Sequence, residues 1–205
     1  MISILDLNLG NTKSLSNCFN YMGVKHSLIS KSNEIKKTDL LVIPGVGSFD
    51  YAMDLLHKKK LTDVIIEHSI IKKKPIVGIC IGMQIFFSSS EEGNKKGLGL
   101  FPYKLQKLKK NDEYKVPNVG FRKIHNFQNK GIFKDVEEDI NLYFTNSFGL
   151  KFKKTFDFDN YSMTRHKFNY LAGFQKNNII GLQFHPELSH VSGMIILKNI
   201  YKNLF

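Results

Sequence analysis

Short apolar runs alternate with amphipathic segments along the N-terminal part of the chain and again at its C-terminal end. Runs bounded by turn residues predict strands, and apolar positions spaced three and four apart predict helices. We expect strands at residues 2–7, 25–30, 40–45, 75–79 and 179–184, and helical segments at 11–23, 48–60, 61–73, 81–89 and 189–205. Strands that alternate with helices form a parallel sheet covered on both faces.

The central part of the chain has a different pattern. Beyond Gly99, aromatic residues recur in short, partly alternating segments with polar turns between them, which predicts antiparallel strands. These segments cover residues 103–110, 121–127, 141–148, 153–160 and 169–178. The predicted fold class is α/β, with a doubly wound, mostly parallel sheet, flanking helices and an additional antiparallel β portion.

Two of the predicted helices have recognisable ends. The segment 11–23 stops at Gly23 and places Cys18 on its apolar face, which gives this thiol a structural role. Ser189 is an N-cap candidate for the final helix.

Length and composition favour one globular domain over residues 1–205, because 42% of the 205 residues are hydrophobic. The two cysteines are too few for a disulfide framework and lack metal-ligand spacing. The first residues contain no basic stretch ahead of an apolar one, and no apolar run reaches spanning length. We therefore expect a cytoplasmic protein with no metal and no cofactor.

The formal net charge of +12 raises the question of a nucleic-acid partner. Only Arg122 and Arg165 are arginines, and the lysines are scattered in short groups at the ends of apolar segments. Nucleic-acid recognition favours arginine with interleaved aromatic residues. We expect solvated lysine surfaces and neither a nucleic acid nor a membrane as partner, although some lysines could attract a phosphorylated substrate or an acidic partner.

Cys80 stands between Gly78 and Gly82, at the junction of a predicted strand and a predicted helix. This spacing is typical of a nucleophile held in a sharp turn, since small residues two positions away let the strand and the helix pass closely. A helix N-terminus also favours a thiolate, and its free backbone N–H groups can stabilise an oxyanion. The alternative is that Cys80 is simply a small buried apolar residue, as free cysteines usually are.

A thiolate nucleophile needs a base, and His185 is the candidate among seven histidines. It ends an apolar strand and precedes Pro186, which favours an extended conformation at the residue before it. In an extended segment Glu187 would lie on the same side as the His185 ring, where a carboxylate can fix the imidazole tautomer. Alternatively, the three residues are only a polar strand end.

Four stretches together resemble the class I glutamine amidotransferases, and within them most closely the glutaminase subunits of imidazole glycerol phosphate synthase. In chain order they are PGVGSFDYAM (44–53), GICIGMQ (78–84), SSEEG with GLGLF (89–101) and QFHPE (183–187). The resemblance covers nearly the whole chain. The order Cys80, His185, Glu187 on a doubly wound sheet is also that of this family.

The resemblance implies that Cys80 attacks the side-chain amide of glutamine, that His185 is base and acid, and that Glu187 orients His185. Ammonia would pass to a (β/α)8 barrel cyclase subunit as heterodimer partner, in histidine biosynthesis. The resemblance also implies which residues bind the oxyanion and the glutamine: Gly45, Val46, Gly47, Ile81 and Gln84. Without the family, the glycines of GVG (45–47) would be read only as a truncated phosphate-loop pattern. Gln84 would be read as a solvated residue of a helix.

Around the triad the sequence departs from its relatives. PNVGFR (117–122) stands where the family usually has Pro-His-x-Gly-Trp-Asn, and YFTNSF (143–148) where it has Tyr-Phe-x-His-Ser-Tyr. Leu188 replaces a common lysine after HPE. The altered residues are Asn118, Phe121, Arg122, Asn146, Phe148 and Leu188.

Three alternatives to this function remain at the level of sequence. The altered surroundings leave room for a paralogous amidotransferase with another acceptor, such as a nucleotide-linked sugar. The net charge leaves room for a non-catalytic basic binding module, although no arginine or aromatic stripe supports it. A peptidase or glyoxalase-like relative could share the turn at Cys80, but HPE ahead of a C-terminal helix and GMQ after the cysteine argue against it.

Overall fold

The parallel half of the main sheet is built by the apolar runs that the sequence pattern predicts as strands. The computed structural model describes residues 1–137, 140–153 and 156–204. Within them the parallel strands lie in the order β2 (His26–Ile29), β1 (Ile2–Leu5), β3 (Leu40–Gly45), β4 (Ile76–Cys80) and β12 (Ile179–Leu182). In-register pairing sets Gly45 opposite Cys80 and Leu182 opposite Ile79, so the carboxyl ends of the central strands meet at one edge.

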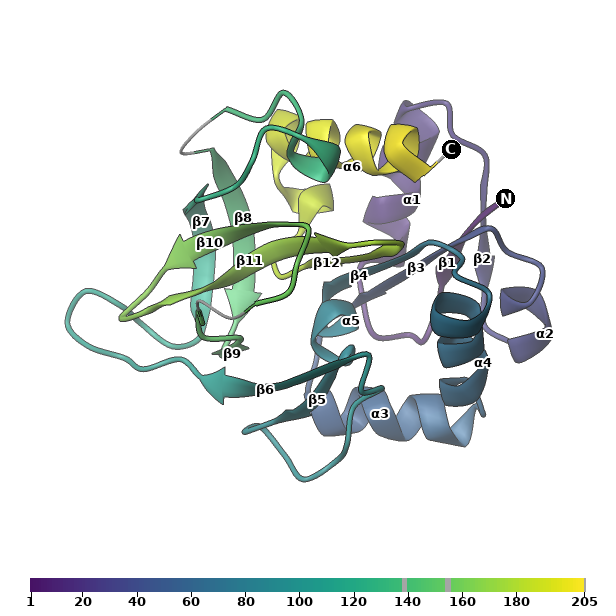
Figure 1. Ribbon diagram of the computed structural model, residues 1–205, viewed down its shortest axis with the longest axis horizontal. Coiled ribbons are helices and arrows are strands. Elements are labelled where there is room, and N and C mark those ends of the chain that lie inside the picture. Colours follow the sequence, from purple (N-terminus) through teal and green to yellow (C-terminus); the bar gives the residue numbers. More distant parts are fainter. Residues whose placement is uncertain (138–139, 154–155, 205) are drawn as a thin grey trace.

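Helices cover both faces of this parallel half (Figure 1). On one face lie α1 (Thr12–Tyr21) and α6 (His190–Leu204). On the other lie α3 (Phe49–Lys58), α4 (Thr62–Ile66) and α5 (Ile81–Gln84), while the short α2 (Ser32–Ile35), which the sequence pattern missed, follows β2. Successive residues of β3 pack into opposite core clusters, Leu41 and Ile43 with α3 and Leu40 and Val42 with α1. The doubly wound architecture is therefore confirmed.

The aromatic central segments add an antiparallel half to the same sheet. From β12 the order continues through β11 (Asn169–Lys176), β10 (Asn160–Arg165), β7 (Asn118–His125) and β8 (Asn141–Asn146). A single bridge then joins Tyr143 of β8 to His185, just beyond β12. The far end of the sheet thus curls back to the carboxyl edge of the parallel half, as the steep β7 and β8 in Figure 1 illustrate.

The predicted helix at 81–89 is wrong beyond its first turn. After α5 the chain enters β5 (Phe87–Ser90), which pairs with β6 (Phe101–Lys107), and β6 pairs in turn with β9 (Phe148–Gly149). Consecutive serines favour local hydrogen bonds over a helix interior. The Phe87 ring also packs against both Phe101 and Phe174, at centroid distances of 6.1 and 6.0 Å, which requires the chain to turn back over the sheet.

The strand predicted at 153–160 is also wrong for residues 153 and 156–159. Residues 154 and 155 lie outside the described residues. Phe156 and Phe158 are not in a strand, and the next strand, β10, starts at Asn160. Their rings join an aromatic cluster, with Phe158 stacked on Phe174 at 4.3 Å. The alternating aromatic residues of this segment pack their rings together, but their backbone does not pair with a neighbouring strand.

The segment after α4 forms a π-helical turn, Glu67–Ile71, which buries His68 to 2% exposure. The Nε2 atom of His68 lies 3.0 Å from the carbonyl oxygen of Pro75, just before β4. This contact needs a proton on Nε2, which the Nε2–H tautomer of the neutral ring supplies. Two further short turns, Gly131–Phe133 and Pro186–Leu188, complete the described elements.

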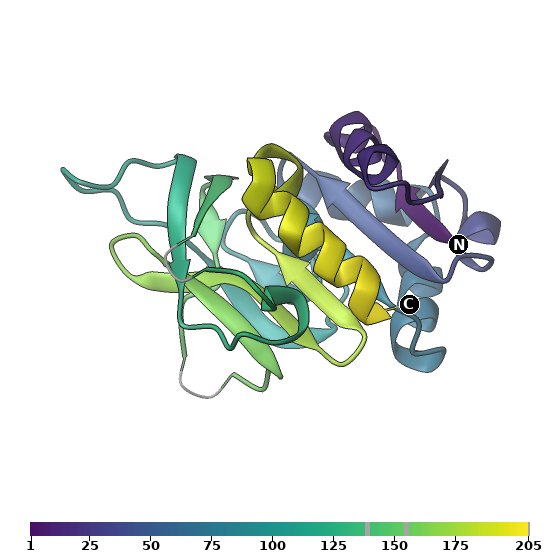
Figure 2. The ribbon, with the colours of Figure 1, turned by 90° about the horizontal axis from the view of Figure 1, so that it is seen from above.

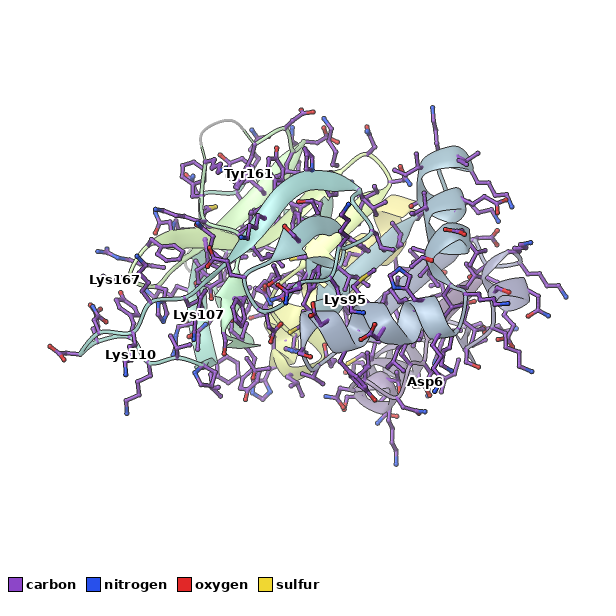
Figure 3. All side chains as sticks on the ribbon, turned by 90° about the horizontal axis from the view of Figure 1, so that it is seen from below. Asp6, Lys95, Lys107, Lys110, Tyr161 and Lys167 are labelled. Atoms are coloured by element: carbon purple, nitrogen blue, oxygen red, sulfur yellow. The ribbon has the colours of Figure 1, made fainter. Side chains whose placement is uncertain are left out.

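The exposed lysines of the described residues lie on many different elements and do not form one stripe. Figure 3 shows Lys107, Lys110 and Lys167 at the end built by the antiparallel strands, whereas Lys95 lies beside α3. Seen from above in Figure 2, α6 crosses the sheet between the antiparallel strands and the N-terminal part of the chain. None of the helices in the described part of the chain is long and apolar enough to cross a membrane.

We expect His68 to make folding stability fall as the pH is lowered. Burial, only partly opposed by the Pro75 carbonyl, lowers the pKa of His68, so near pH 6.5 and below the unfolded chain binds a proton that the folded chain resists. The stability of the wild type relative to His68→Gln, which can still donate to Pro75 but does not titrate, should therefore decrease between pH 8 and pH 5. Urea unfolding at several pH values measures this difference, and a difference that stays constant with pH would contradict it.

Candidate active site

Cys80 is the last residue of β4 and lies directly before α5. Its backbone has φ +54° and ψ −110°, which an L-residue adopts only at a cost of roughly 1–3 kcal/mol. Its side chain is buried, with 5% exposed. Such strain persists only where the surrounding structure holds the turn in place.

The flanking glycines explain how the turn is held. A Cβ atom on Gly82 would lie 1.8 Å from the carbonyl oxygen of Ile43 in β3. One on Gly78 would lie 2.3 Å from the carbonyl oxygen of Gly82. Helix α5 therefore rests directly on the backbone of two strands, and no side chain fits between them.

His185 and Glu187 lie beside this turn, on the segment that follows β12. The backbone N–H of His185 donates to Tyr143 at 2.8 Å, and the Ser189 hydroxyl donates to the His185 carbonyl at 2.6 Å. His185 Nδ1 lies 2.8 Å from Glu187 Oε1, and their side chains are only 3% and 1% exposed. Glu187 belongs to a 3-10 turn, Pro186–Leu188, not to the extended segment that the sequence predicts.

The predicted N-cap, Ser189, uses its hydroxyl differently from a helix cap. Besides donating to His185, the hydroxyl accepts the backbone N–H of Tyr143 at 2.9 Å. Ser189 therefore fastens the His185 segment to β8.

The electrostatics of His185 favour its protonated form. Burial opposes the charge, but the interactions with Cys80 and Glu187 outweigh burial and raise the pKa of His185. Within the described part of the chain, His185 Nε2 and Glu187 Oε2 are buried without a hydrogen-bond partner. An imidazole oriented through Nδ1, with Nε2 unpartnered, is suited to carrying a proton.

A cavity of about 180 Å³ opens at Cys80. This equals the liquid volume of about six water molecules, enough for a ligand the size of an amino acid. The predicted residues Val46, Gly47, Ile81 and Gln84 line it together with residues that the sequence reasoning did not select as site residues: Glu92, Pro117, Thr145, Asn146, Ser147 and Phe148. Glu92 lies in the quoted SSEEG stretch, and the others lie in the two stretches, 117–122 and 143–148, that depart from the family pattern, so each carried a signal that could have been used.

Glu92 gives this cavity a carboxylate. Its Oε2 atom accepts the backbone N–H of Phe49 at 2.8 Å. Burial raises the pKa of Glu92, the Phe49 bond opposes this, and nearby Asp50 adds to the increase. A half-buried carboxylate in a polar pocket suits a cationic group of a ligand.

The Gly45–Gly47 segment crosses the site next to α5. A Cβ atom on Gly45 would lie 2.2 Å from a methyl carbon of Ile81, so the segment touches α5. The backbone N–H of Val46 donates to the carbonyl of Leu9, away from Cys80. Gly47 has φ +134°, which favours glycine. The first N–H of α5, that of Ile81, is unpaired within the helix as at any helix start.

Comparison with known proteins identifies the family. The family model "Glutamine amidotransferase class-I" matches residues 3–204. The chain is 34% identical over 202 residues to imidazole glycerol phosphate synthase subunit HisH of Leptospira interrogans, covering 97% of this chain and 98% of that protein. It is 35% identical over 210 residues to the subunit HisH of Sulfurimonas denitrificans, covering 100% of both.

Solved structures share the fold at lower identity. PurLQS from Thermotoga maritima superposes with a TM-score of 0.72 and 19% identity, covering 100% of this chain and 98% of that one. The glutaminase domain of Trypanosoma brucei CTPS superposes with a TM-score of 0.66 and 12% identity, covering 100% and 94%. The chain belongs to the class I glutamine amidotransferase family.

We expect Gly82→Ala to lower the free energy of unfolding by on the order of 3 kcal/mol or more, because the new methyl group would overlap the backbone oxygen of Ile43, which cannot rotate away. Gly23→Ala is the matched control: its φ of +69° is strained, but no atom lies within 4 Å, so a loss of about 1 kcal/mol is expected. Urea unfolding compares the two. Equal losses would mean that α5 can move off β3 at little cost.

Proposed function

We propose that this class I glutamine amidotransferase is the glutaminase subunit of an imidazole glycerol phosphate synthase. It hydrolyses glutamine to glutamate and ammonia and passes the ammonia to a (β/α)8 barrel cyclase subunit in histidine biosynthesis, in the cytoplasm. The observation that carries the proposal is Cys80 in its strained turn, next to the buried His185–Glu187 pair and open to an amino-acid-sized cavity. The full-length similarity to HisH subunits supports this acceptor pathway over a nucleotide-linked sugar.

In the proposed mechanism the Cys80 sulfur, as thiolate, attacks the side-chain carbonyl carbon of glutamine. His185 holds the proton and gives it to the nitrogen as the carbon–nitrogen bond breaks, which releases ammonia and leaves a glutamyl thioester. The raised pKa of His185 supports this role, because a protonated ring is available for the leaving group. Water, deprotonated by His185, then attacks the thioester to give glutamate and restore the sulfur. Glu187 orients the ring throughout.

The cavity fits the two ends of glutamine. Cys80 takes the amide end, and the Glu92 carboxylate offers a counter-charge for the α-ammonium group. Gln84 lines the wall between α5 and β9, with its Nε2 atom donating to the Phe148 carbonyl at 3.2 Å.

The oxyanion of the tetrahedral intermediate needs donors. The Ile81 N–H is one, and a backbone N–H of the Gly45–Gly47 segment is the second. Because the Val46 N–H donates to Leu9, that peptide must rotate before it can serve. We therefore propose that the subunit alone is slow and that partner binding promotes the rotation.

The surface around the site has the character of a partner interface. A shallow hollow beside His185 is lined by residues of the Asn8–Asn11 loop together with Val46, Tyr143, Thr145 and Leu188. Val119 and Phe121 of β7 expose 50% and 42% of their surface, and the Phe121 ring stacks on His190 at 5.5 Å. Apolar and aromatic groups of this kind favour protein–protein contact. We propose that the barrel subunit docks here to form the heterodimer.

We expect Cys80→Ala to abolish glutamine hydrolysis while the protein stays folded, because no other group can form the thioester and alanine fits the turn. A glutamine-like electrophile should label Cys80 and spare Cys18, which is half-buried on α1 against the core and lies outside the cavity. Ammonia release, circular dichroism and peptide mass spectrometry provide the measurements. Hydrolysis that survives in Cys80→Ala, or equal labelling of both cysteines, would refute the assignment.

We expect Leu188→Asp to weaken activation by the barrel subunit at least about tenfold, because a carboxylate would be buried without a partner in an apolar interface. Leu188 is 37% exposed at the rim of the hollow. Leu28→Asp is the matched control, since Leu28 is 50% exposed on β2 away from the hollow. Glutaminase rates titrated with the substrate-loaded cognate barrel give the affinity of each variant. Identical titrations for both variants would place the partner elsewhere.

A further inference from the structure

Gln183 contacts the nucleophile, although the mechanism above gives it no role. It follows β12 directly, where Leu182 lies opposite Ile79, and this pairing brings Gln183 next to Cys80. Its side chain is fully buried. The Nε2 atom donates to Cys80 Sγ at 3.7 Å, and the Oε1 atom accepts from Gln84 Nε2 at 2.9 Å.

The direction of this chain of hydrogen bonds is determined by a backbone carbonyl. Phe148 O can only accept, so the Gln84 atom facing it at 3.2 Å must be the amide nitrogen. The same nitrogen faces Gln183, so the Gln183 atom it meets must be the oxygen. The amide nitrogen of Gln183 is thereby turned to the sulfur.

A second amide locks the Phe148 carbonyl in place. Asn146 Nδ2 donates to Phe148 O at 2.9 Å. Asn118 Nδ2 in turn faces Asn146 Oδ1 at 3.4 Å and the hydroxyl of buried Tyr170 at 2.9 Å. The orientation of Gln183 thus rests on a connected network that reaches from the core to the cavity wall.

The sulfur faces groups with opposite effects on a negative charge. The carbonyl oxygen of Thr145, 3.7 Å from Sγ, accepts from a thiol but disfavours a thiolate. Glu92 across the cavity and Glu187 behind His185 add negative charge. Burial raises the pKa of Tyr170, so its phenol is neutral and adds none. Protonated His185 and the N–H group of Gln183 favour the thiolate.

We propose that Gln183 stabilises and positions the Cys80 thiolate through its N–H group, and that its bond to Gln84 couples the nucleophile to the wall of the substrate cavity. This rests on the proposed function only in taking Cys80 as the nucleophile. A buried donor aimed at a charged acceptor contributes more than a neutral hydrogen bond. The test follows the sulfur itself and does not require glutamine hydrolysis.

The experiment measures the rate of Cys80 alkylation by iodoacetamide from pH 5 to 10, with peptide mass spectrometry separating Cys80 from Cys18. In Gln183→Met, which keeps the length but loses the donor, the pH midpoint should move upward by about one to two units. Glutamine turnover should fall in kcat, on the order of tenfold, with a smaller change in KM.

Two further variants keep the test decisive. Gln175→Met makes the same substitution in β11, where the side chain accepts the backbone N–H of Ile132 remote from Cys80, and its alkylation midpoint should match the wild type. Gln183→Glu retains an acceptor for Gln84 and should also shift the midpoint upward, which covers the case in which the methionine variant does not fold. A wild-type midpoint in the folded Gln183 variants, or an equal shift in Gln175→Met, would overturn the proposal. If the alkylation shift appears but the wild type shows no glutaminase activity even with the substrate-loaded cognate barrel subunit, the proposed function fails and the role of Gln183 at the sulfur stands.

Discussion

The contact between Gly82 and the backbone of Ile43 is the constraint on which the site depends. It allows α5 to begin at once after β4, and so forces Cys80 into a positive φ with its sulfur at the carboxyl edge of the sheet. A side chain at Gly82 would separate α5 from β3, and one at Gly78 would separate α5 from β4, and either would release the strain. The energy that holds Cys80 there comes from the packing of α5 between β3, β4 and β12, since each hydrogen bond or contact alone is too weak to maintain such strain.

The antiparallel half of the sheet supplies the other wall of the cavity. Because β8 returns to bridge His185, Thr145 and Asn146 lie against Cys80 although they are far from it in sequence. Buried amides then tie this wall to the parallel half through the Phe148 carbonyl and Gln84. A polar network in the interior is costly unless its members are paired, and here most of its donors find acceptors. One of its acceptors, Asn118 Oδ1, has no partner among the described residues.

The sequence predicted the parallel half of the fold well because buried strands and amphipathic helices have distinct periodicities. It also singled out Cys80 and His185, since chemistry at strand ends follows from the sheet topology. The helix expected at 81–89 failed because a short apolar run ahead of serines is compatible with both a helix and a strand. The packing of Phe87 against Phe101 and Phe174 favours the strand, and these contacts are not visible in the sequence. The cavity wall from Thr145 to Phe148 lies in a stretch that the sequence marked only as a departure from the family pattern. Its place beside Cys80 depends on the curl of β8, a long-range contact that local patterns do not predict.

The loop that holds the oxyanion segment also lies on the proposed partner surface. Leu9 accepts the N–H of Val46, and the same loop, from Asn8 to Asn11, lines the hollow beside His185 and Leu188. A partner seated in this hollow would therefore press on the group that keeps the Val46 peptide turned away from Cys80. A ligand shifts such an equilibrium only by its differential affinity for the two orientations. In the proposed function this places the control of glutamine hydrolysis in a single peptide bond, while the strained turn and the His185–Glu187 pair remain assembled throughout.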